Sequence, residues 1–509
     1  MACEIIVLLC VAVLIKIADL PKYWSLSLIA IALLPICFLS TSAYSTFDYS
    51  YIFFPALRLN SGFGIKEIYF QYDLFMSLLA ALWMKLHLDI NNFRVLGQVS
   101  IYLLLIAEFL LARSLFSTKK LPYFLLATLI LIKIYSYIVD PTFCIQLTPL
   151  RLDFWILPLL LVRWRGSYSI FIGLTLALLN IFHRNFGFLY TLSYLEFIFV
   201  LFLIDLVEVY SAKRSLYILI KKYFLLTYPN LILIGSSLIL DYFIFGGLTP
   251  ESAILYQKLG FGFMRIAPNS FYWYVPFLLA MTFLLLLNQR KTISAPYFST
   301  GVFLIFLSVA NSVYFFGRSH ESNIIHISGS LIFLVYMLMD LLYERFTLSV
   351  ENRELKKSSL YLYTKHFIGL LPLLFIMLIT YFYSERILRN VTIHAKNLQS
   401  LQFTYPNSIT KKTTDIRGIT NNSNKVYFMG QGIADFFYYY YGNYVPPGYF
   451  LPFVAWPYKK DAVDFLQNLI NENYYIVVKQ NEMLFGKEMI EALTYHHSFD
   501  NQEYKVLWK

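Results

Sequence analysis

The chain has 509 residues, of which 58% are hydrophobic, 19% aromatic and only 14% charged. A soluble domain carries roughly 25% charged residues, so this composition excludes an ordinary soluble protein and indicates a chain whose solvent is the lipid bilayer. A net charge of +11 would suit nucleic-acid binding in a soluble protein. In a membrane protein, basic cytoplasmic loops produce the same excess, so we expect no nucleic-acid partner.

Apolar windows close to the roughly 20 residues of a transmembrane helix recur from the N-terminus to residue 384. Each could cross a hydrocarbon core of about 30 Å, and the backbone must satisfy its own hydrogen bonds there, so the windows predict α-helices. We expect an all-α polytopic membrane protein with about 11 to 13 transmembrane helices. The candidate spans are 3–17, 24–42, 95–116, 121–139, 150–162, 167–182, 186–209, 223–245, 273–288, 297–316, 324–343 and 367–384.

The basic residues of the short loops give the orientation of these spans. Most of them fall on one side of the predicted membrane, and the positive-inside rule makes that side cytoplasmic. These residues are Lys22, Lys119, Lys120, Arg163, Arg165, Lys213, Arg214, Lys221, Lys222, Arg290, Lys291, Arg345, Arg353, Lys356, Lys357 and Lys365.

The same orientation places residues 43–94 outside as one long first loop. Segment 74–88, LFMSLLAALWMKLHL, is apolar enough to be another span. If it crossed, Lys119 and Lys120 would move outside, so we interpret it as an interfacial, juxtamembrane helix. A loop of this length is usually functional.

The composition changes after residue 384. Segments 425–430 and 474–479 read as strands, and 461–473 has the apolar spacing of a helix between them. We therefore predict a transmembrane domain over 1–384 and a small α/β domain over 385–509. The orientation places that second domain outside the cytoplasm.

Ionisable residues are few near the outer face, and they come from several separate loops. Such groups are costly close to a bilayer, so they usually face a cavity, pair with one another or form a functional site. Any single one of them could instead be a rim residue in contact with lipid headgroups. The substrate-binding candidates are Arg58, Asp140, Arg151, Asp153, His183, Arg184, Arg265, Arg318 and His320.

Asp48 is the candidate catalytic residue. It is the carboxylate that opens the long apolar loop, in STFDYSYIFFPALRLNSG. A positioned carboxylate can act as a general base. The alternative is that Asp48 caps a helix that begins near Tyr49.

The remaining candidates also allow two interpretations. Arg318 and His320, in FFGRSHES, would suit a lipid phosphate, or Arg318 could pair with Glu321 in a tight turn. Asp140 and Asp153 could hold a divalent cation such as Mg²⁺ or Mn²⁺, share acid and base roles, or form ion pairs with a nearby arginine. The basic residues close to these two aspartates in the predicted loops are Arg151, His183 and Arg184.

Arg265 lies in the long external loop 248–274, which is rich in glycine and aromatic residues. This loop could form a lipid-facing lid or a plain re-entrant hairpin.

The layout resembles that of the GT-C superfamily of membrane glycosyltransferases. The segments that carry the resemblance are TFDYSYIFFPALRLNSG followed by FQYDLFMSLLAALWMKL, which look like the first external loop of that family, with Asp48 at the acid position. FFGRSHESNIIHIS is similar to a Gly-Arg-Ser-His turn of uncharacterised bacterial members. The resemblance implies an inverting glycosyltransferase of a bacterial inner membrane that takes its sugar from a polyprenyl-phosphate donor on the extracytoplasmic face.

In that interpretation Asp48 is the general base, and Arg318 and His320 lie at the donor phosphate. The acceptor would be a lipid, a glycan or a protein. Two alternatives remain open: a polysaccharide polymerase or ligase, and a lipid-linked sugar flippase or transporter, which would favour charges at mid-membrane and repeated halves.

Overall fold

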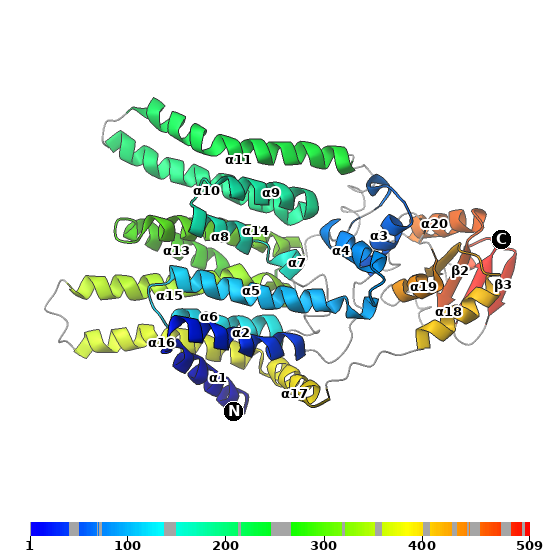
Figure 1. Cartoon of the computed structure of the whole chain (residues 1–509), viewed down its shortest axis with the longest axis horizontal. Coiled ribbons are helices and arrows are strands. Elements are labelled where there is room, and N and C mark those ends of the chain that lie inside the picture. The colour runs from blue at the N-terminus through cyan, green and yellow to red at the C-terminus, as the bar shows by residue number, and fades with distance from the viewer. Residues whose placement is uncertain are drawn as a thin grey trace.

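The structure is a computed structural model of the whole chain. It describes residues 2–39, 50–68, 70, 74–136, 149–211, 215–245, 266–317, 321–351, 359–400, 408–429, 435–444, 447, 459–479, 490–500 and 504–509. Helices of a large bundle lie roughly side by side, and a small domain with a β-sheet extends beyond one end of the bundle (Figure 1).

The bundle is built from helices whose sequences are almost entirely apolar. They are α1 (Ala2–Ala18), α2 (Lys22–Leu39), α5 (Arg94–Leu115), α6 (Leu121–Ile130), α8 (Ile156–Arg165), α9 (Ile170–Phe182), α10 (Arg184–Ser211), α11 (Leu216–Phe245), α13 (Val275–Gln289), α14 (Ala295–Gly317), α15 (Glu321–Glu351) and α16 (Ser359–Phe382). The short π-helix η3 (Leu131–Tyr135) continues α6, and η5 (Phe271–Tyr274) precedes α13.

Five of the described helical segments are long and apolar enough to cross a membrane. They are Val95–Leu115, Leu216–Phe245, Phe271–Gln289, Ala295–Phe315 and Asn323–Glu344. The pair His366–Phe382 and Ser384–Lys396, bent by 85°, would make a sixth if it counts as one span, and five shorter apolar helices accompany them. The predicted fold class, an α-helical membrane protein with a small C-terminal α/β domain, is confirmed.

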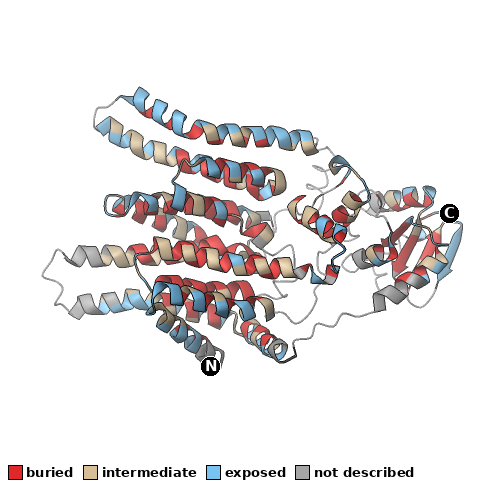
Figure 2. Cartoon of the chain, in the orientation of Figure 1, coloured by how far each residue is buried: buried red, intermediate tan, exposed pale blue. Residues whose placement is uncertain are grey.

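The pattern of buried and exposed side chains in the bundle is the one expected for helices surrounded by lipid. Inward-facing residues such as Tyr190, Phe303 and Met337 expose none of their surface. The outer helix α11 is instead exposed along much of its length (Figure 2), and its exposed side chains include Ile232, Ile239 and Phe243. Exposed apolar side chains along such a helix are expected where lipid replaces water.

Polar contacts fix the loops at the basic end of the bundle. Asp340 of α15 is fully buried, and its carboxylate accepts hydrogen bonds from the backbone N–H groups of Ser117 and Thr118 at 2.9 and 3.0 Å. Buried carboxylates need such donors. Asp340 therefore connects the turn between α5 and α6 to helix α15.

Short helices lie across the other end of the bundle. They are α3 (Ser50–Asn60), η1 (Ile65–Glu67), α4 (Leu74–Lys85), η2 (Ile90–Asn92) and α7 (Pro149–Leu152). α3 and α4 pack against each other and lie between the bundle and the small domain (Figure 1). Segment 74–88, interpreted from the sequence as a juxtamembrane helix, contains α4.

The C-terminal part contains α17 (Ser384–Ser400), α18 (Ser408–Ile419), β1 (Val426–Met429), α19 (Asp435–Gly442), α20 (Lys459–Asn471), β2 (Tyr475–Lys479), β3 (His497–Asp500) and β4 (Tyr504–Trp508). α17 packs against α2 and η3 of the bundle. The strand order is β1-β2-β4-β3, with β1 parallel to β2 and the other pairs antiparallel.

Both faces of the sheet are packed against helices. On one face, Ile476 and Val478 pack with Leu466 and Ile470 of α20. On the other face, Phe428 and Val506 join a cluster that includes α3 and α4, where the rings of Phe54 and Tyr439 meet edge to face at 5.0 Å. The sheet is therefore docked onto the juxtamembrane helices through an apolar contact.

Candidate functional site

The candidate site is formed at the end of the bundle that carries α3, α4 and α7 (Figure 1). Two bundle helices are short there. α8 has 10 residues and α9 has 13, so at 1.5 Å per residue they are only about 15 and 20 Å long. Both are therefore shorter than a hydrocarbon core, which is about 30 Å thick.

Asp153 lies three residues before α8 and is only 2% exposed. Lys133 of η3 approaches both of its carboxylate oxygens at 3.0 Å, and the indole N–H of Trp155 donates to Oδ1 at 3.1 Å. Lys133 also donates to the backbone carbonyl of His326 at 2.8 Å. This ion pair is buried, so each partner needs the other to offset the loss of its hydration.

Glu108 of α5 is fully buried beside this pair. Neither of its carboxylate oxygens has a hydrogen-bond partner among the described residues. Gly329 of α15 allows this approach: a Cβ at that position would be 2.9 Å from Asp153 Oδ1 and 3.1 Å from Glu108 Oε1. Two carboxyl groups and one ammonium thus meet where three helical elements converge.

Arg151 belongs to α7, two residues before Asp153, and is 7% exposed. Its guanidinium carbon lies 5.3 Å from the centre of the Tyr314 ring, on the last two turns of α14. A guanidinium presents five N–H donors in a planar fork that suits phosphate. The chain continues from Tyr314 to Arg318 in four residues, so Arg151 lies close to where the GRSH segment begins.

His183 terminates α9 and is 1% exposed. Its Nε2 lies 3.1 Å from the carbonyl oxygen of Leu150 in α7, and its ring packs edge to face on Phe154 at 5.1 Å. The corner that holds it depends on Gly187, where a Cβ would lie 2.4 Å from the backbone of Leu179. Arg151 therefore lies in α7, Asp153 follows that helix directly, and His183 contacts it through the Leu150 carbonyl.

Two other candidates lie apart from this group. Arg184 pairs with Asp241 of α11 at 2.8 Å and lies over the Phe245 ring at 4.2 Å, so it connects α10 to α11. Arg58 of α3 lies over the Phe63 ring at 4.0 Å and donates to the Glu67 carbonyl at 3.4 Å. None of these contacts involves Asp153.

Asp48, Asp140, Arg265, Arg318 and His320 lie outside the described residues. The helices that flank them end at the same end of the bundle as α7 (Figure 1). α3 begins two residues after Asp48, α14 ends one residue before Arg318, and α15 begins one residue after His320.

Lys133 and Glu108 were not among the residues predicted from the sequence. Both stand inside apolar windows, LILIKIYSY and LLLIAEFLLARS. An ionisable residue within a span is itself a signal of function or of a buried partner, and that signal would have found them. Among the described residues, no three histidine, cysteine, aspartate or glutamate side chains gather as a metal site.

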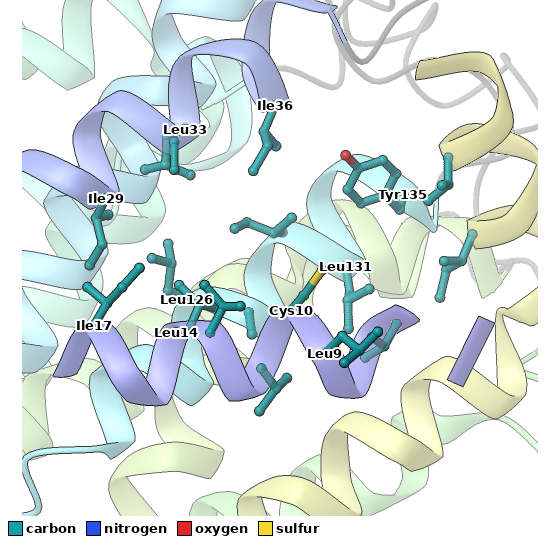
Figure 3. Close-up of a pocket in the computed structure, with 18 of the residues that line it drawn as sticks. Leu9, Cys10, Leu14, Ile17, Ile29, Leu33, Ile36, Leu126, Leu131 and Tyr135 are labelled. Atoms are coloured by element: carbon teal, nitrogen blue, oxygen red, sulfur yellow. The ribbon is translucent and has the colours of Figure 1, made fainter. Parts of the chain in front are cut away.

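An apolar groove of about 470 Å³ lies between α1, α2, α6 and α17 (Figure 3). Its walls carry aliphatic side chains such as Leu14, Leu33 and Leu126, and it ends at Tyr135. The Tyr135 hydroxyl is 2.7 Å from Nδ1 of His394 on α17. Leu9 on the groove wall is 62% exposed, so the groove opens onto the surface of the bundle.

No family model matches the chain, and no curated protein matches it significantly. It resembles two solved structures of ArnT from Cupriavidus metallidurans. For ArnT bound to undecaprenyl phosphate the identity is 11%, over 95% of this chain and 97% of that chain, with a TM-score of 0.39. For the apo state the identity is 11%, over 96% and 98%, with a TM-score of 0.43. Both scores are low, and the proposals below rest on residues of this chain.

Proposed function

We propose that the chain is a membrane glycosyltransferase of the GT-C, inverting type. It moves a sugar from a polyprenyl-phosphate donor to an acceptor on the extracytoplasmic face of a bacterial inner membrane. The observation that carries this proposal is the grouping of Arg151, Asp153 and His183 at one end of the bundle, with Lys133 beneath them. The basic loops lie at the opposite end, which the positive-inside rule makes cytoplasmic.

The roles follow from the positions of the charges. Asp48 is proposed as the general base that removes a proton from the acceptor hydroxyl as the new bond forms. Arg318 and His320 are proposed to neutralise the charge that develops on the departing phosphate. Arg151, beside Tyr314 at 5.3 Å, is the described cation that supports this assignment. Asp153 is held by Lys133, so its role is to fix the segment that presents Arg151.

The groove between α1, α2, α6 and α17 suits the polyprenyl tail of the donor. Its lining is almost wholly aliphatic, and it opens to the surface where Leu9 is exposed. Its polar end is formed by Tyr135, which lies two residues from Lys133 on the same π-helix. A chain seated in this groove would therefore end at Tyr135.

A second candidate is a lipid-linked sugar flippase or transporter. The specific observation in its favour is the group formed by Glu108, Lys133 and Asp153, all of them almost fully buried inside the bundle. Ionisable residues at such depth commonly line transport pathways.

One pair of assays separates the two functions. Purified protein is incubated with a panel of radiolabelled polyprenyl-phosphate monosaccharides and an acceptor-containing membrane extract, and free polyprenyl phosphate is measured. A transferase releases it, and Arg318→Ala lowers the rate more than Arg318→Lys, since lysine keeps the charge but loses the planar fork. If the donor instead crosses the bilayer of proteoliposomes intact, with no release, the transferase proposal is wrong.

A further inference from the structure

Besides the apolar groove, the bundle has a polar cavity, which lies at the opposite end from the candidate site. It has a volume of about 550 Å³ and is lined by the turn between α8 and α9, by α10 and α11, and by the beginning of α14. Its wall includes Arg163, Ser167, Asp205, Arg290 and Ser299. Nothing in the proposed transfer reaction uses this cavity.

The acidic group in the cavity is already neutralised. Asp205 accepts from the Tyr223 hydroxyl at 3.0 Å, from Lys222 at 3.2 Å and from Arg290 at 3.4 Å. Arg290 is further paired with Glu208 at 2.9 Å. These contacts use the two carboxylates and one of the arginines, so a further anion would meet neither an uncompensated acid nor a free Arg290.

Arg163 is the cation in the wall with donors to spare. One terminal nitrogen donates to the carbonyl of Ser114 at the end of α5. The Nε atom is buried and has no hydrogen-bond partner among the described residues. A guanidinium carries five N–H donors, and the Ser114 carbonyl uses one of them, so Arg163 keeps donors for an acceptor in the cavity that it lines.

The surroundings indicate what kind of acceptor this is. Three basic groups, Arg163, Arg290 and Lys222, face two acidic ones, Asp205 and Glu208, which leaves one positive charge in excess. Trp164, 55% exposed, stands beside Arg163, and tryptophan prefers the depth of lipid headgroups. The exposed bases Lys221 and Lys291 extend the positive surface.

We propose that this cavity binds the phosphate of an anionic phospholipid headgroup from the leaflet next to the basic loops. The phosphate oxygens would accept from Arg163, with the Ser167 hydroxyl as a further donor. A free phosphate ion shares this chemistry, and the experiment distinguishes the two sources. This proposal does not depend on the sugar-transfer function.

The experiment measures the thermal midpoint of the whole purified protein in detergent with three additions: phosphatidylglycerol, phosphatidylcholine and inorganic phosphate. We expect phosphatidylglycerol to raise the midpoint by at least about 2 °C, because a ligand that binds the folded state stabilises it. Phosphatidylcholine and inorganic phosphate should raise it by less than half as much. Equal shifts with inorganic phosphate would overturn the lipid source.

Arg163→Gln should abolish most of the phosphatidylglycerol shift, and the matched control Arg165→Gln, which removes an exposed charge two residues away, should keep it. If Arg163→Gln does not fold, Ser299→Tyr narrows the cavity without changing charge and should reduce the lipid retained in native mass spectrometry at least about threefold, a loss of under 1 kcal/mol in binding. Unchanged retention in Ser299→Tyr, or an equal shift in Arg163→Gln and Arg165→Gln, would contradict the proposal.

Discussion

Lys133 approaches both carboxylate oxygens of Asp153 at 3.0 Å, and the two side chains expose only 4% and 2% of their surface. The same ammonium donates to the His326 carbonyl of α15 at 2.8 Å. Lys133 therefore connects three parts of the chain: η3, to which it belongs, the segment that precedes α8, and α15. That segment also carries Arg151, so this ion pair supports the position of a candidate phosphate ligand.

Breaking this pair should be more harmful than removing it. Lys133→Met leaves the Asp153 carboxylate buried without its cation, and we expect a loss of roughly 3–5 kcal/mol of stability. The double variant Lys133→Met/Asp153→Leu should recover much of that loss. Thermal unfolding of the purified variants measures the difference.

The pair formed by Lys222 and Asp205 provides the control. Its side chains are 55% and 26% exposed, and exposed pairs contribute only about 0–1 kcal/mol. Lys222→Met should therefore shift the unfolding midpoint much less than Lys133→Met. Equal shifts would show that Lys133 and Asp153 are hydrated.

Gly329 should tolerate no side chain. A Cβ there would lie 2.9 Å from Asp153 Oδ1 and 3.1 Å from Glu108 Oε1, so Gly329→Ala must displace both carboxyl groups. We expect a cost of about 1–3 kcal/mol, the usual range for overpacking.

A matched glycine tests this interpretation. Gly369 is also in a bundle helix, and a Cβ there would meet nothing within 4 Å. Gly369→Ala should be neutral or slightly stabilising because alanine favours the helix. Glu108→Gln keeps the shape of the side chain, so it should fold. If Gly329→Ala unfolds at the wild-type temperature, the packing around Asp153 is looser than the structure indicates.

The sequence predicted the class of fold because apolar windows and basic loops are local signals. It also predicted the strand now found at Val426–Met429 and the helix within Lys459–Asn471. The docking of the C-terminal part on α3 could not be predicted, since contacts such as that of Phe54 with Tyr439 of α19 join residues far apart in the sequence and follow no local period.

For the candidate site, the outer-face residues predicted from the sequence include Arg151, Asp153 and His183, which lie in or beside the short helix α7. Lys133 and Glu108 were not predicted, because both lie inside predicted spans and not near the predicted loops. The partners of Lys133 are Asp153 before α8 and the His326 carbonyl of α15, so the pairing is a property of tertiary packing. Arg58 and Arg184 were also predicted, but the contacts described above for them do not involve Asp153.

The orientation of the membrane domain can be tested at the C-terminus. The basic loops predict that residues 385–509 lie outside the cytoplasm. A reporter that is active only in the cytoplasm, fused after Lys509, should give no signal, whereas the same reporter inserted in the loop at Arg214 should be active. Strong activity at Lys509 would reverse the orientation and remove the basis for an extracytoplasmic site.

The groove proposed for the polyprenyl tail can be filled. Ala32 lines it, and Ala32→Trp should occupy space that the lipid needs, so the KM for the donor should rise by about tenfold, as expected for 1.4 kcal/mol of lost binding. Leu28 is on the same helix, is 40% exposed and lies outside the groove. Leu28→Trp should leave the KM unchanged, and an equal rise in both variants would contradict a specific lipid site.

The proposed base is tested by Asp48→Asn. Asparagine is nearly isosteric with aspartate and also caps helices well, but it cannot accept a proton as a general base. If Asp48 only caps the helix that begins at Ser50, the substitution should change stability by well under 1 kcal/mol and leave transfer intact. If Asp48 is the base, the variant should insert and unfold like wild type, yet lose sugar transfer by roughly 100-fold or more.

To distinguish these cases, kcat and the free energy of unfolding are both measured on the same preparation. Asp48→Ala serves as the second variant, because it removes both the cap and the base and should lose transfer as severely as Asp48→Asn while also losing about 1 kcal/mol of stability. Near-normal transfer in Asp48→Asn would make Asp48 a cap. Asp140 would then become the better candidate for the base, since Asp153 is engaged by Lys133 at both of its oxygens and a carboxylate held in that way is poorly placed to accept a proton.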